Sequence, residues 1–580
     1  MSLLVKEIKN QIKTQIFAAA DKAAKAGKLP KCDALSDFAV EIPADKSRGD
    51  YAVNAAMVWS RAFKNAPRKI AEALVEFADF TDMHIDRVEV AGPGFINLFL
   101  ADSFYSAVLK DVLKKGDDYG RSDLGKGKKY MVEFVSANPT GPMHIGNARG
   151  GALGDCLASV LDFAGYDVTR EFYVNDAGNQ IQKFGCSLEA RYLQIYKPET
   201  EFPEDGYHGA DITARAREFA EINGGAFVES TPEERRKALV DYALPLNIEA
   251  LKTDLETYRI NYDVWFRESS LYKSGELDKV LSILKDNGMT YEKDGALWYK
   301  NIEVQTKMLK NEGKSDEYIE KLGLKDDVLI RANGNPTYFA ADIAYHYNKF
   351  VDRGFDKVIN IWGADHHGHV ARLKGAMDAL GIDSDKLDIV LMQLVRLVRN
   401  GEVVKVSKRT GKSITLKTLL DEVPLDAARF IFNSKESNTH LEFDLDLAIE
   451  QSSKNPVFYV QYAYARICSI VRNLHSEGIE LHDVDASVLD MLKEPEEREL
   501  ISLVSAFTGE IEAVAKSYDS ARITRYAYDL ATLFHKFYNA CRVKVDDNNL
   551  LEARLTLCKA TAITLKNVLS LLKINAPESM

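Results

Sequence analysis

Residues 133–147 read Glu-Phe-Val-Ser-Ala-Asn-Pro-Thr-Gly-Pro-Met-His-Ile-Gly-Asn. The apolar run over 130–135 predicts a short buried strand, and the segment over about 145–164 predicts a helix. The Gly- and Pro-rich residues between them therefore form a strand-to-helix loop. In a doubly wound parallel sheet, the first loop of this kind is where ligands bind.

Three residues at the start of the predicted helix could contact a nucleotide. His144 and Asn147 lie in its first turn, where free backbone amides and the helix dipole favour phosphate. Gly146 has no side chain, so a flat base could approach the backbone there. A lone His-x-Gly-x pattern matches many chains by chance, so this interpretation needs support from the rest of the sequence.

The strands outside this loop indicate a parallel sheet. They are predicted over 168–174, 357–362 and 387–392, each beside a helical segment. Alternating strands and helices are typical of a doubly wound α/β fold, so the middle of the chain is predicted to be Rossmann-like. A charged helical insertion over about 198–260 carries no recognisable chemistry.

Two further regions flank this domain. The N-terminal region reads as an α+β module, and residues 114–129, rich in Gly, Lys and Asp, read as a linker. From about residue 420 the pattern is entirely helical, which predicts a C-terminal all-α bundle. The predicted domains are 1–120, 121–454 with the insertion and the loop at 405–412, and 455–580.

Composition restricts the class of protein. With 580 residues, 46% of them hydrophobic and 28% charged, the chain has the balance of a globular protein of several domains. The net charge of −12 gives no global basic field, so contact with nucleic acid must be local. No apolar run approaches the ~18 residues of a membrane span. Six scattered cysteines without a C-x-x-C pair argue against disulfides and structural zinc and favour the reducing cytoplasm.

A second loop, Lys405-Val-Ser-Lys408-Arg-Thr-Gly-Lys412, follows the last predicted strand. Two lysines three residues apart can close over a polyphosphate and neutralise a leaving pyrophosphate. Taken alone, the segment is better interpreted as a solvated basic loop. Together with the loop at 133–147 on an α/β fold, the nucleotide interpretation is favoured.

The two loops resemble the HIGH and KMSKS signatures of class I aminoacyl-tRNA synthetases. Residues 136–147 resemble the arginyl-tRNA synthetases more specifically, as do 362–369, 441–447 and 576–580. Asp426-Ala-Ala-Arg429 is similar to the DALR tag of that family's anticodon-binding bundle. Asn147 replaces the final His of the first signature and Val406 replaces the Met of the second, while both groups expected to touch phosphate are retained.

The resemblance implies an arginine–tRNA ligase. Such an enzyme joins L-arginine and ATP, which carries Mg²⁺ on its phosphates, to arginyl-adenylate and releases pyrophosphate. It then transfers arginine to the 3′-terminal adenosine of its tRNA, and activation usually requires bound tRNA. The resemblance further implies an N-terminal tRNA-binding module, an anticodon-binding bundle and a monomer.

The amino-acid pocket can also be argued from the residues. Arginine is a planar cation with five donors, so it needs a carboxylate. Tyr338 and Asp342 are four residues apart at a predicted helix start and face the same way. The alternative for Asp342 is a carboxylate that only interacts with the helix dipole. The resemblance favours the pocket, and it adds Glu133 and Asn138 near the α-amino and carboxyl end of the substrate.

The cluster His366-His367-Gly-His369 could be a metal site, but no cysteine lies nearby, and no metal is predicted. By resemblance, this segment instead lines the adenosine pocket. The implied residues are His144, Lys405 and Lys408 in catalysis; His144, Gly146, Asn147, Gly363, Asp365, His366 and Lys408 for ATP; and Glu133, Asn138, Tyr338 and Asp342 for arginine.

Three alternatives are left open. Another class I synthetase, such as one for cysteine, should show zinc ligands. A non-catalytic RNA-binding relative should have lost the two loops. A nucleotidyltransferase with a small adenylylated product would leave the helical bundle unexplained.

Overall fold

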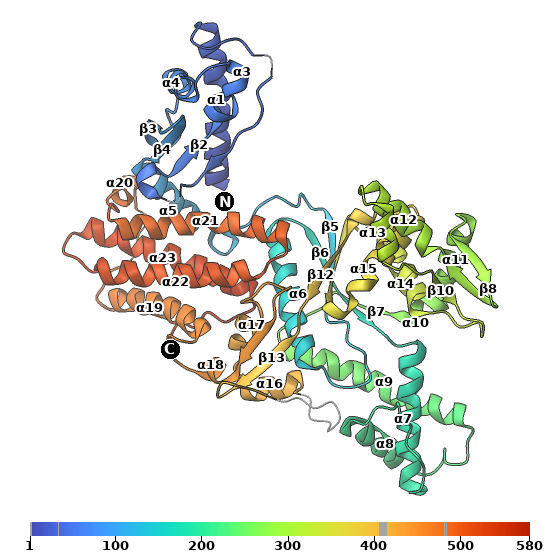
Figure 1. Ribbon diagram of the computed structural model, residues 1–580. Coiled ribbons are helices and arrows are strands. Elements are labelled where there is room, and N and C mark those ends of the chain that lie inside the picture. Colours follow the sequence, from blue (N-terminus) through green and yellow to red (C-terminus); the bar gives the residue numbers. More distant parts are fainter. Residues whose placement is uncertain (1–2, 33, 44, 405–413, 481, 483) are drawn as a thin grey trace.

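The structure is a computed structural model that describes residues 3–32, 34–43, 45–404, 414–480, 482 and 484–580. Figure 1 shows an N-terminal module resting on a helical bundle, with the sheet-containing part of the chain beside the bundle. Lys405, Lys408 and Val406 lie outside the described residues.

A five-stranded parallel sheet lies at the centre of the chain, in the order β12-β11-β5-β6-β7. The chain leaves β5 in one direction to β6 and β7, and later returns on the other side of β5 to β11 and β12. The crevice of a doubly wound sheet therefore lies at the carboxyl ends of β5 and β11. The predicted α/β fold is confirmed, and the strands are β5 Lys129–Glu133, β6 Asp167–Val174, β7 Val264–Arg267, β11 Lys357–Gly363 and β12 Leu387–Met392.

Helices pack against this sheet and extend from it. The first is α6, whose glycines allow close packing: a Cβ at Gly154 would lie 2.2 Å from the ring of Phe134, just after β5. The insertion is helical, as predicted, and has a small apolar core of its own. These helices are α6 Ile145–Phe163, α7 Gly178–Tyr196, α8 Ala210–Asn223, α9 Pro232–Thr257, α10 Glu268–Lys273, α11 Glu276–Asp286, α12 Asn301–Asn311, α13 Asp316–Lys321, α14 Tyr338–Tyr347 and α15 His367–Ala379.

Two smaller sheets accompany the central one. One is antiparallel, with the order β10-β9-β8, and the other has the order β14-β13-β15. The expectation of helices only beyond residue 420 is wrong, because Leu441 and Phe443 are buried on either side of exposed Glu442 and form a strand parallel to β13. The elements are β8 Thr290–Lys293, β9 Ala296–Tyr299, β10 Asp327–Ile330, β13 Val395–Arg399, β14 Glu402–Val403, β15 Leu441–Asp444, α16 Leu416–Glu422, α17 Leu425–Phe432 and α18 Leu445–Ile449.

The N-terminal module is α+β, as predicted. Its antiparallel sheet has the order β1-β2-β4-β3 and packs with α1, whose Ile8, Ile12 and Ile16 are buried at helical spacing. The module meets the bundle through α5. Its elements are α1 Leu3–Lys25, β1 Val40–Glu41, β2 Tyr51–Val53, α2 Ala55–Val58, α3 Ser60–Phe63, α4 Pro67–Phe77, β3 Ile85–Ala91, β4 Phe95–Leu100 and α5 Asp102–Lys115.

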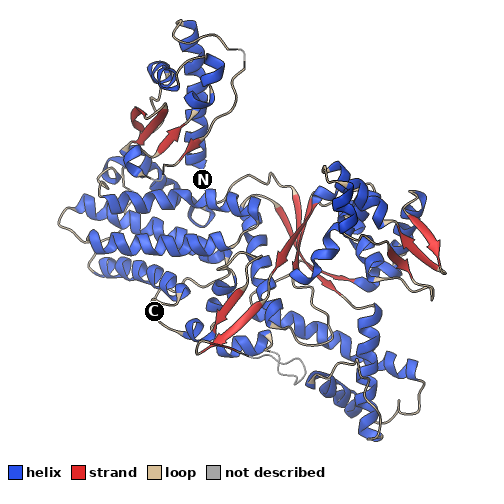
Figure 2. Ribbon diagram, viewed as in Figure 1, coloured by secondary structure: helices blue, strands red, loops and turns tan. Residues whose placement is uncertain are grey.

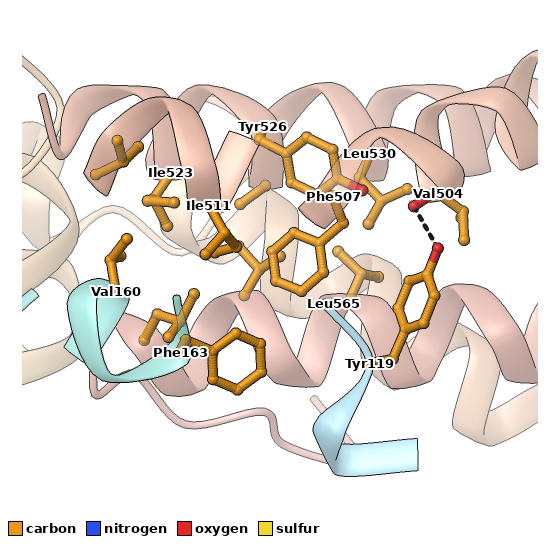
Figure 3. Close-up of a cluster of buried hydrophobic side chains, with 14 of the residues drawn as sticks. Tyr119, Val160, Phe163, Val504, Phe507, Ile511, Ile523, Tyr526, Leu530 and Leu565 are labelled. Atoms are coloured by element: carbon orange, nitrogen blue, oxygen red, sulfur yellow. Dashed lines mark hydrogen bonds between the residues drawn. The ribbon is translucent and has the colours of Figure 1, made fainter. Parts of the chain in front are cut away.

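The described residues after 455 contain helices and loops only (Figure 2). The bundle packs directly on α6, because Phe163 at the end of α6 meets the ring of Phe507 (Figure 3). The segment predicted as a linker is packed instead: Tyr119 is buried, and its hydroxyl donates to the Val504 carbonyl at 3.0 Å. The bundle helices are α19 Pro456–Ser476, α20 Ala486–Leu489, α21 Pro495–Ser517, α22 Ala521–Ala540 and α23 Asn548–Leu571.

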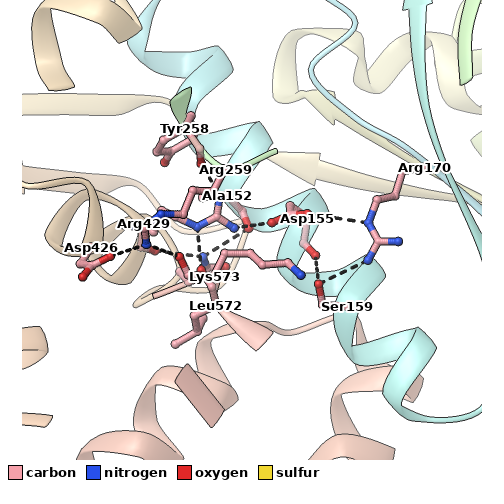
Figure 4. Close-up of polar contacts among 11 residues, drawn as sticks. Ala152, Asp155, Ser159, Arg170, Tyr258, Arg259, Asp426, Arg429, Leu572 and Lys573 are labelled. Atoms are coloured by element: carbon pink, nitrogen blue, oxygen red, sulfur yellow. Dashed lines mark hydrogen bonds and ion pairs between the residues drawn. The ribbon is translucent and has the colours of Figure 1, made fainter. Parts of the chain in front are cut away.

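A buried guanidinium joins the central domain to the bundle (Figure 4). Arg429 on α17 is fully buried and pairs with Asp155 in the middle of α6. It also donates to the carbonyls of Tyr258, after α9, and Leu572, at the end of α23, at 2.8 and 2.6 Å. One side chain therefore connects three segments that are distant in sequence.

We expect Arg429→Met to lower the free energy of unfolding by about 3 kcal/mol or more, because it leaves Asp155 buried without its principal cation. The matched control is Arg399→Met, which breaks the exposed pair with Glu422 and should cost under about 1 kcal/mol. Thermal and urea unfolding of the two variants would measure the difference. Equal losses of stability would show that the buried pair is not a special constraint.

Candidate active site

The N-terminus of α6 is capped by His144. Its Nδ1 accepts from the backbone amides of Gly146 at 3.1 Å and Asn147 at 3.4 Å, and the Asn147 side chain accepts from the His144 amide at 3.0 Å. Because Nδ1 is an acceptor, the neutral ring carries its proton on Nε2. A Cβ at Gly146 would lie 2.9 Å from His144 Cε1. The close approach of the His144 ring therefore requires glycine at position 146, whether or not a ligand is bound.

The second loop begins and ends at described residues, and its far end lies beside this cap. Thr415 forms a backbone bridge with His144, and the Leu416 amide donates to the Met143 carbonyl at 2.8 Å. The structure thus brings the end of the segment that contains Lys405 and Lys408 to the first loop. The positions of the two lysines themselves lie outside the described residues.

The loop after β5 is strained. Val135 and Ser136 have φ angles of 68° and 41°, in the left-handed region that a β-branched residue rarely adopts. Such conformations cost about 1–3 kcal/mol each and are concentrated at functional sites. The Ser136 hydroxyl compensates by donating to Glu133 at 2.9 Å and accepting from the Tyr173 amide at 3.1 Å.

Beneath this loop lies a buried polar layer. Lys349 is fully buried, donates to Glu133 Oε2 at 2.6 Å and to Asn360 Oδ1 at 3.2 Å, and belongs to a π-helical turn. Asn360 also bonds His346 Nε2 at 2.8 Å. Burial, aided by the charge of Lys349, holds the pKa of His346 well below its usual value, so this histidine stays neutral.

Two of the residues predicted to bind arginine, Tyr338 and Asp342, lie in the first turns of α14. Tyr338 is 39% exposed, and its hydroxyl accepts from the Gln180 amide on α7 at 3.2 Å. The Asp342 carboxylate lies 2.9 Å from His369 Nε2. Nearby, Glu268 follows β7 and is buried, and it accepts from the Tyr272 hydroxyl at 2.9 Å. Burial raises the pKa of Glu268 to about 7, and the negative charge of Asp342 adds to the rise.

The carboxylates of this region fall into two classes. Glu133 pairs with Lys349 and Glu171 pairs with Arg353, so each of these is neutralised within the protein. Among the described residues, Asp342 instead contacts a histidine, and Glu268 contacts tyrosine and the Asn175 side-chain amide. Two neighbouring carboxylates without a lysine or arginine partner make a site for a cation.

The remaining predicted residues lie at the same edge of the sheet. Asn138 is exposed in the loop after β5, and Gly363 ends β11. Asp365 and His366 follow it, with 84% and 59% of their side chains exposed. No group of three or more His, Cys, Asp or Glu side chains in the described part of the chain could hold a metal ion.

Glu268 and Lys349 were not singled out from the sequence. A signal existed for Glu268, since it is an acidic residue directly after a short strand, Val264–Arg267, of the parallel sheet. For Lys349 there was none, because a lysine in a helical segment is ordinarily solvent-exposed.

Comparison with known proteins agrees with this geometry. Residues 108–467 match the class I (R) tRNA synthetase catalytic domain, 7–100 the arginyl tRNA synthetase N terminal domain and 460–580 the DALR anticodon binding domain. The chain belongs to the arginyl-tRNA synthetase family. It is 55% identical to the arginine–tRNA ligase of Caldanaerobacter subterraneus and 53% identical to that of Acetivibrio thermocellus, each over 100% of both chains. The solved arginyl-tRNA synthetase of Thermus thermophilus shares the fold, with a TM-score of 0.71 at 22% identity over 99% of this chain and 100% of that one.

Membership of the arginyl-tRNA synthetase family confirms the predicted enzyme class, a ligase with ATP, arginine and tRNA as substrates. It sets aside the cysteine enzyme, the non-catalytic relative and the small-product nucleotidyltransferase. None of the described helices is long and apolar enough to cross a membrane.

We expect arginine to bind more tightly as the pH rises through about 7. Glu268 is protonated below its raised pKa and gains its negative charge above it, and a guanidinium bound beside it would be attracted by that charge. If binding requires the ionised form, the dissociation constant should fall about tenfold from about pH 6 to about pH 8. Calorimetric titration of arginine at several pH values would measure this, and Glu268→Gln should remove the dependence. A wild-type dissociation constant that is constant over this range would contradict the assignment.

Proposed function

We propose that the residues at the carboxyl edge of the central sheet divide the chemistry of arginine activation among them. The observation that carries the proposal is the pair of neighbouring carboxylates, Asp342 and Glu268, that meet no lysine or arginine among the described residues. A guanidinium has the charge and planar donors to satisfy both, and Tyr338 lies beside them. Asn138 then takes the α-amino and carboxyl end of arginine, beside Glu133, whose charge Lys349 already meets.

ATP takes the other half of the crevice. His144, with its proton on Nε2, donates to a phosphate at the positive end of α6. The amides of Gly146 and Asn147 already donate to His144 Nδ1, so these two residues meet the nucleotide through close approach of the base to Gly146 and through the Asn147 side of the cap. Gly363, Asp365 and His366 line the adenosine. Mg²⁺ arrives with the ATP phosphates, whose negative charge it helps to neutralise.

The first step is an in-line substitution at phosphorus. A carboxylate oxygen of arginine forms a bond to the α-phosphorus, the bond to the bridging oxygen breaks, and pyrophosphate leaves. The protein positions the reactants and stabilises charge, with Lys405 and Lys408 on the leaving group. A ribose hydroxyl of the terminal tRNA adenosine then attacks the arginyl carbonyl, and AMP leaves.

The bundle offers a surface for unpaired bases. Tyr462 and Tyr538 are each 38% exposed, and the Arg466 guanidinium lies over both rings at 4.6 and 5.0 Å. Aromatic rings and arginine planes are what single-stranded RNA stacks on. We assign anticodon binding to residues 455–580, further tRNA contact to 1–120 and catalysis to 121–454. The enzyme is proposed to act as a cytoplasmic monomer, and its six cysteines are all unpaired, which fits a reducing compartment.

ATP–pyrophosphate exchange with each amino acid, with and without tRNA, tests the reaction. Exchange should be specific for arginine and should depend on arginine tRNA. Exchange with a second amino acid at equal rate would refute the pocket.

We expect Asp342→Asn to lower kcat/KM for arginine by on the order of 10²-fold, because it removes the charge of a group that hydrogen-bonds a cation. The KM for ATP should stay nearly constant. Citrulline, the neutral isostere of arginine, is the control, and its disadvantage relative to arginine should shrink in the variant. Arginine activation near the wild-type rate would leave Asp342 a helix-start residue only.

We expect Lys408→Ala to slow adenylate formation by ~10²–10³-fold, the usual cost of losing one donor to charge that develops in a transition state. Single-turnover activation measures the rate, and a filter assay measures tRNA affinity. A variant that activates arginine normally but no longer binds tRNA would overturn the role given to this lysine.

A further inference from the structure

The Asp342 carboxylate is held by a histidine whose protonation state is fixed by a second contact. His369 Nε2 lies 2.9 Å from Asp342 Oδ2, and Arg372 Nη2 lies 3.1 Å from His369 Nδ1. A guanidinium can only donate, so Nδ1 must be the acceptor of that bond. The proton of the ring is therefore on Nε2, where it is donated to Asp342, and His369 is neutral.

Arg372 is itself fixed in place. Its Nη1 donates to Asp327 Oδ1, on β10, at 2.6 Å, and its guanidinium lies 5.6 Å from the Phe339 ring. His369 is packed between aromatic rings, with Trp362 at 5.6 Å and Phe339 at 5.5 Å between centroids. The chain Asp327–Arg372–His369–Asp342 thus runs from the small antiparallel sheet to the proposed arginine pocket through three consecutive contacts.

The side chain that binds a carboxylate decides how much of the carboxylate's negative charge is left for a ligand. Glu133, held by Lys349, and Glu171, held by Arg353, lose most of their field to the cation beside them. A neutral imidazole can orient a carboxylate through one N–H, and it leaves the negative charge available to a ligand. The remaining lone pairs of the carboxylate can then accept the two parallel donors of a guanidinium.

We propose that His369 is a positioning residue for arginine selectivity, which orients Asp342 without neutralising it, and that Arg372 keeps it in the required neutral form. The proposal rests on the assignment of Asp342 to the guanidinium. If His369 had only a structural role, its charge would not affect selectivity. The proposal predicts that the charge of the residue at position 369 matters as much as its hydrogen bond to Asp342.

Three substitutions separate these properties. His369→Gln keeps a neutral donor, His369→Leu removes the donor, and His369→Lys replaces it with a cation. We expect the preference for arginine over citrulline to stay within about threefold of wild type in His369→Gln. It should fall about tenfold or more in His369→Leu, which loses a hydrogen bond to a charged group, and in His369→Lys, whose cation neutralises Asp342. KM for ATP should change little, and His475→Leu, at an exposed histidine of the bundle, is the matched control.

The outcomes are decisive in each case. If His369→Lys keeps the wild-type preference, or if His369→Gln loses it as fully as His369→Leu does, the proposal is overturned. If His369→Leu does not fold, the preference for arginine over citrulline in His369→Gln and His369→Lys still tests the proposal. A double-mutant cycle separates this proposal from the pocket assignment: in an Asp342→Asn background, the loss caused by His369→Leu should vanish. If Asp342→Asn alone has no effect on arginine, the pocket assignment fails; if it does but His369→Leu acts additively, only the role of His369 fails.

Discussion

The buried guanidinium of Arg429 is the constraint on which the arrangement of the chain depends. Burying a charge is costly unless every donor is met, and here the partners come from α6, from the end of α9 and from the end of α23. Moving any of the three would leave a buried donor or Asp155 unsatisfied. Because His144 caps the start of α6 and Phe163 at its end packs on the bundle, one helix of about 28 Å links the bundle to the loop after β5.

This constraint also explains the place of the DALR-like tag. The resemblance assigned residues 426–429 to the anticodon-binding bundle, yet α17 lies before α19 and outside the matched domain at 460–580. Asp426 accepts from Arg259 at 2.6 Å and from Gln461 at 2.9 Å, and also from the amide of Asn575 near the C-terminus. The tag thus lies between the central domain and the bundle, and its Asp426 and Arg429 each contact both.

Much of this could be predicted from the sequence, and the exceptions have a physical reason. The helix expected over 145–164 and the strand expected over 168–174 match α6 and β6 within one residue, because their apolar patterns are continuous. Tyr338 and Asp342 share a face because helical spacing fixes it. Lys349 and β15 could not be predicted in this way. A buried lysine is stabilised by partners distant in sequence, and a four-residue strand carries too little pattern to outweigh its helical surroundings.

Charge compensation finally separates the carboxylates that a lysine or arginine of the chain already meets from two that have no such partner among the described residues. Asp155, Glu133 and Glu171 meet arginine or lysine, and each joins segments that are far apart in the sequence. Asp342 and Glu268 are held by neutral donors, so part of their interaction with a cation is left unmade in the free protein. A family that binds arginine must keep its own arginines from occupying the pocket. Here Arg372 is anchored by Asp327 and contacts His369, which in turn contacts Asp342.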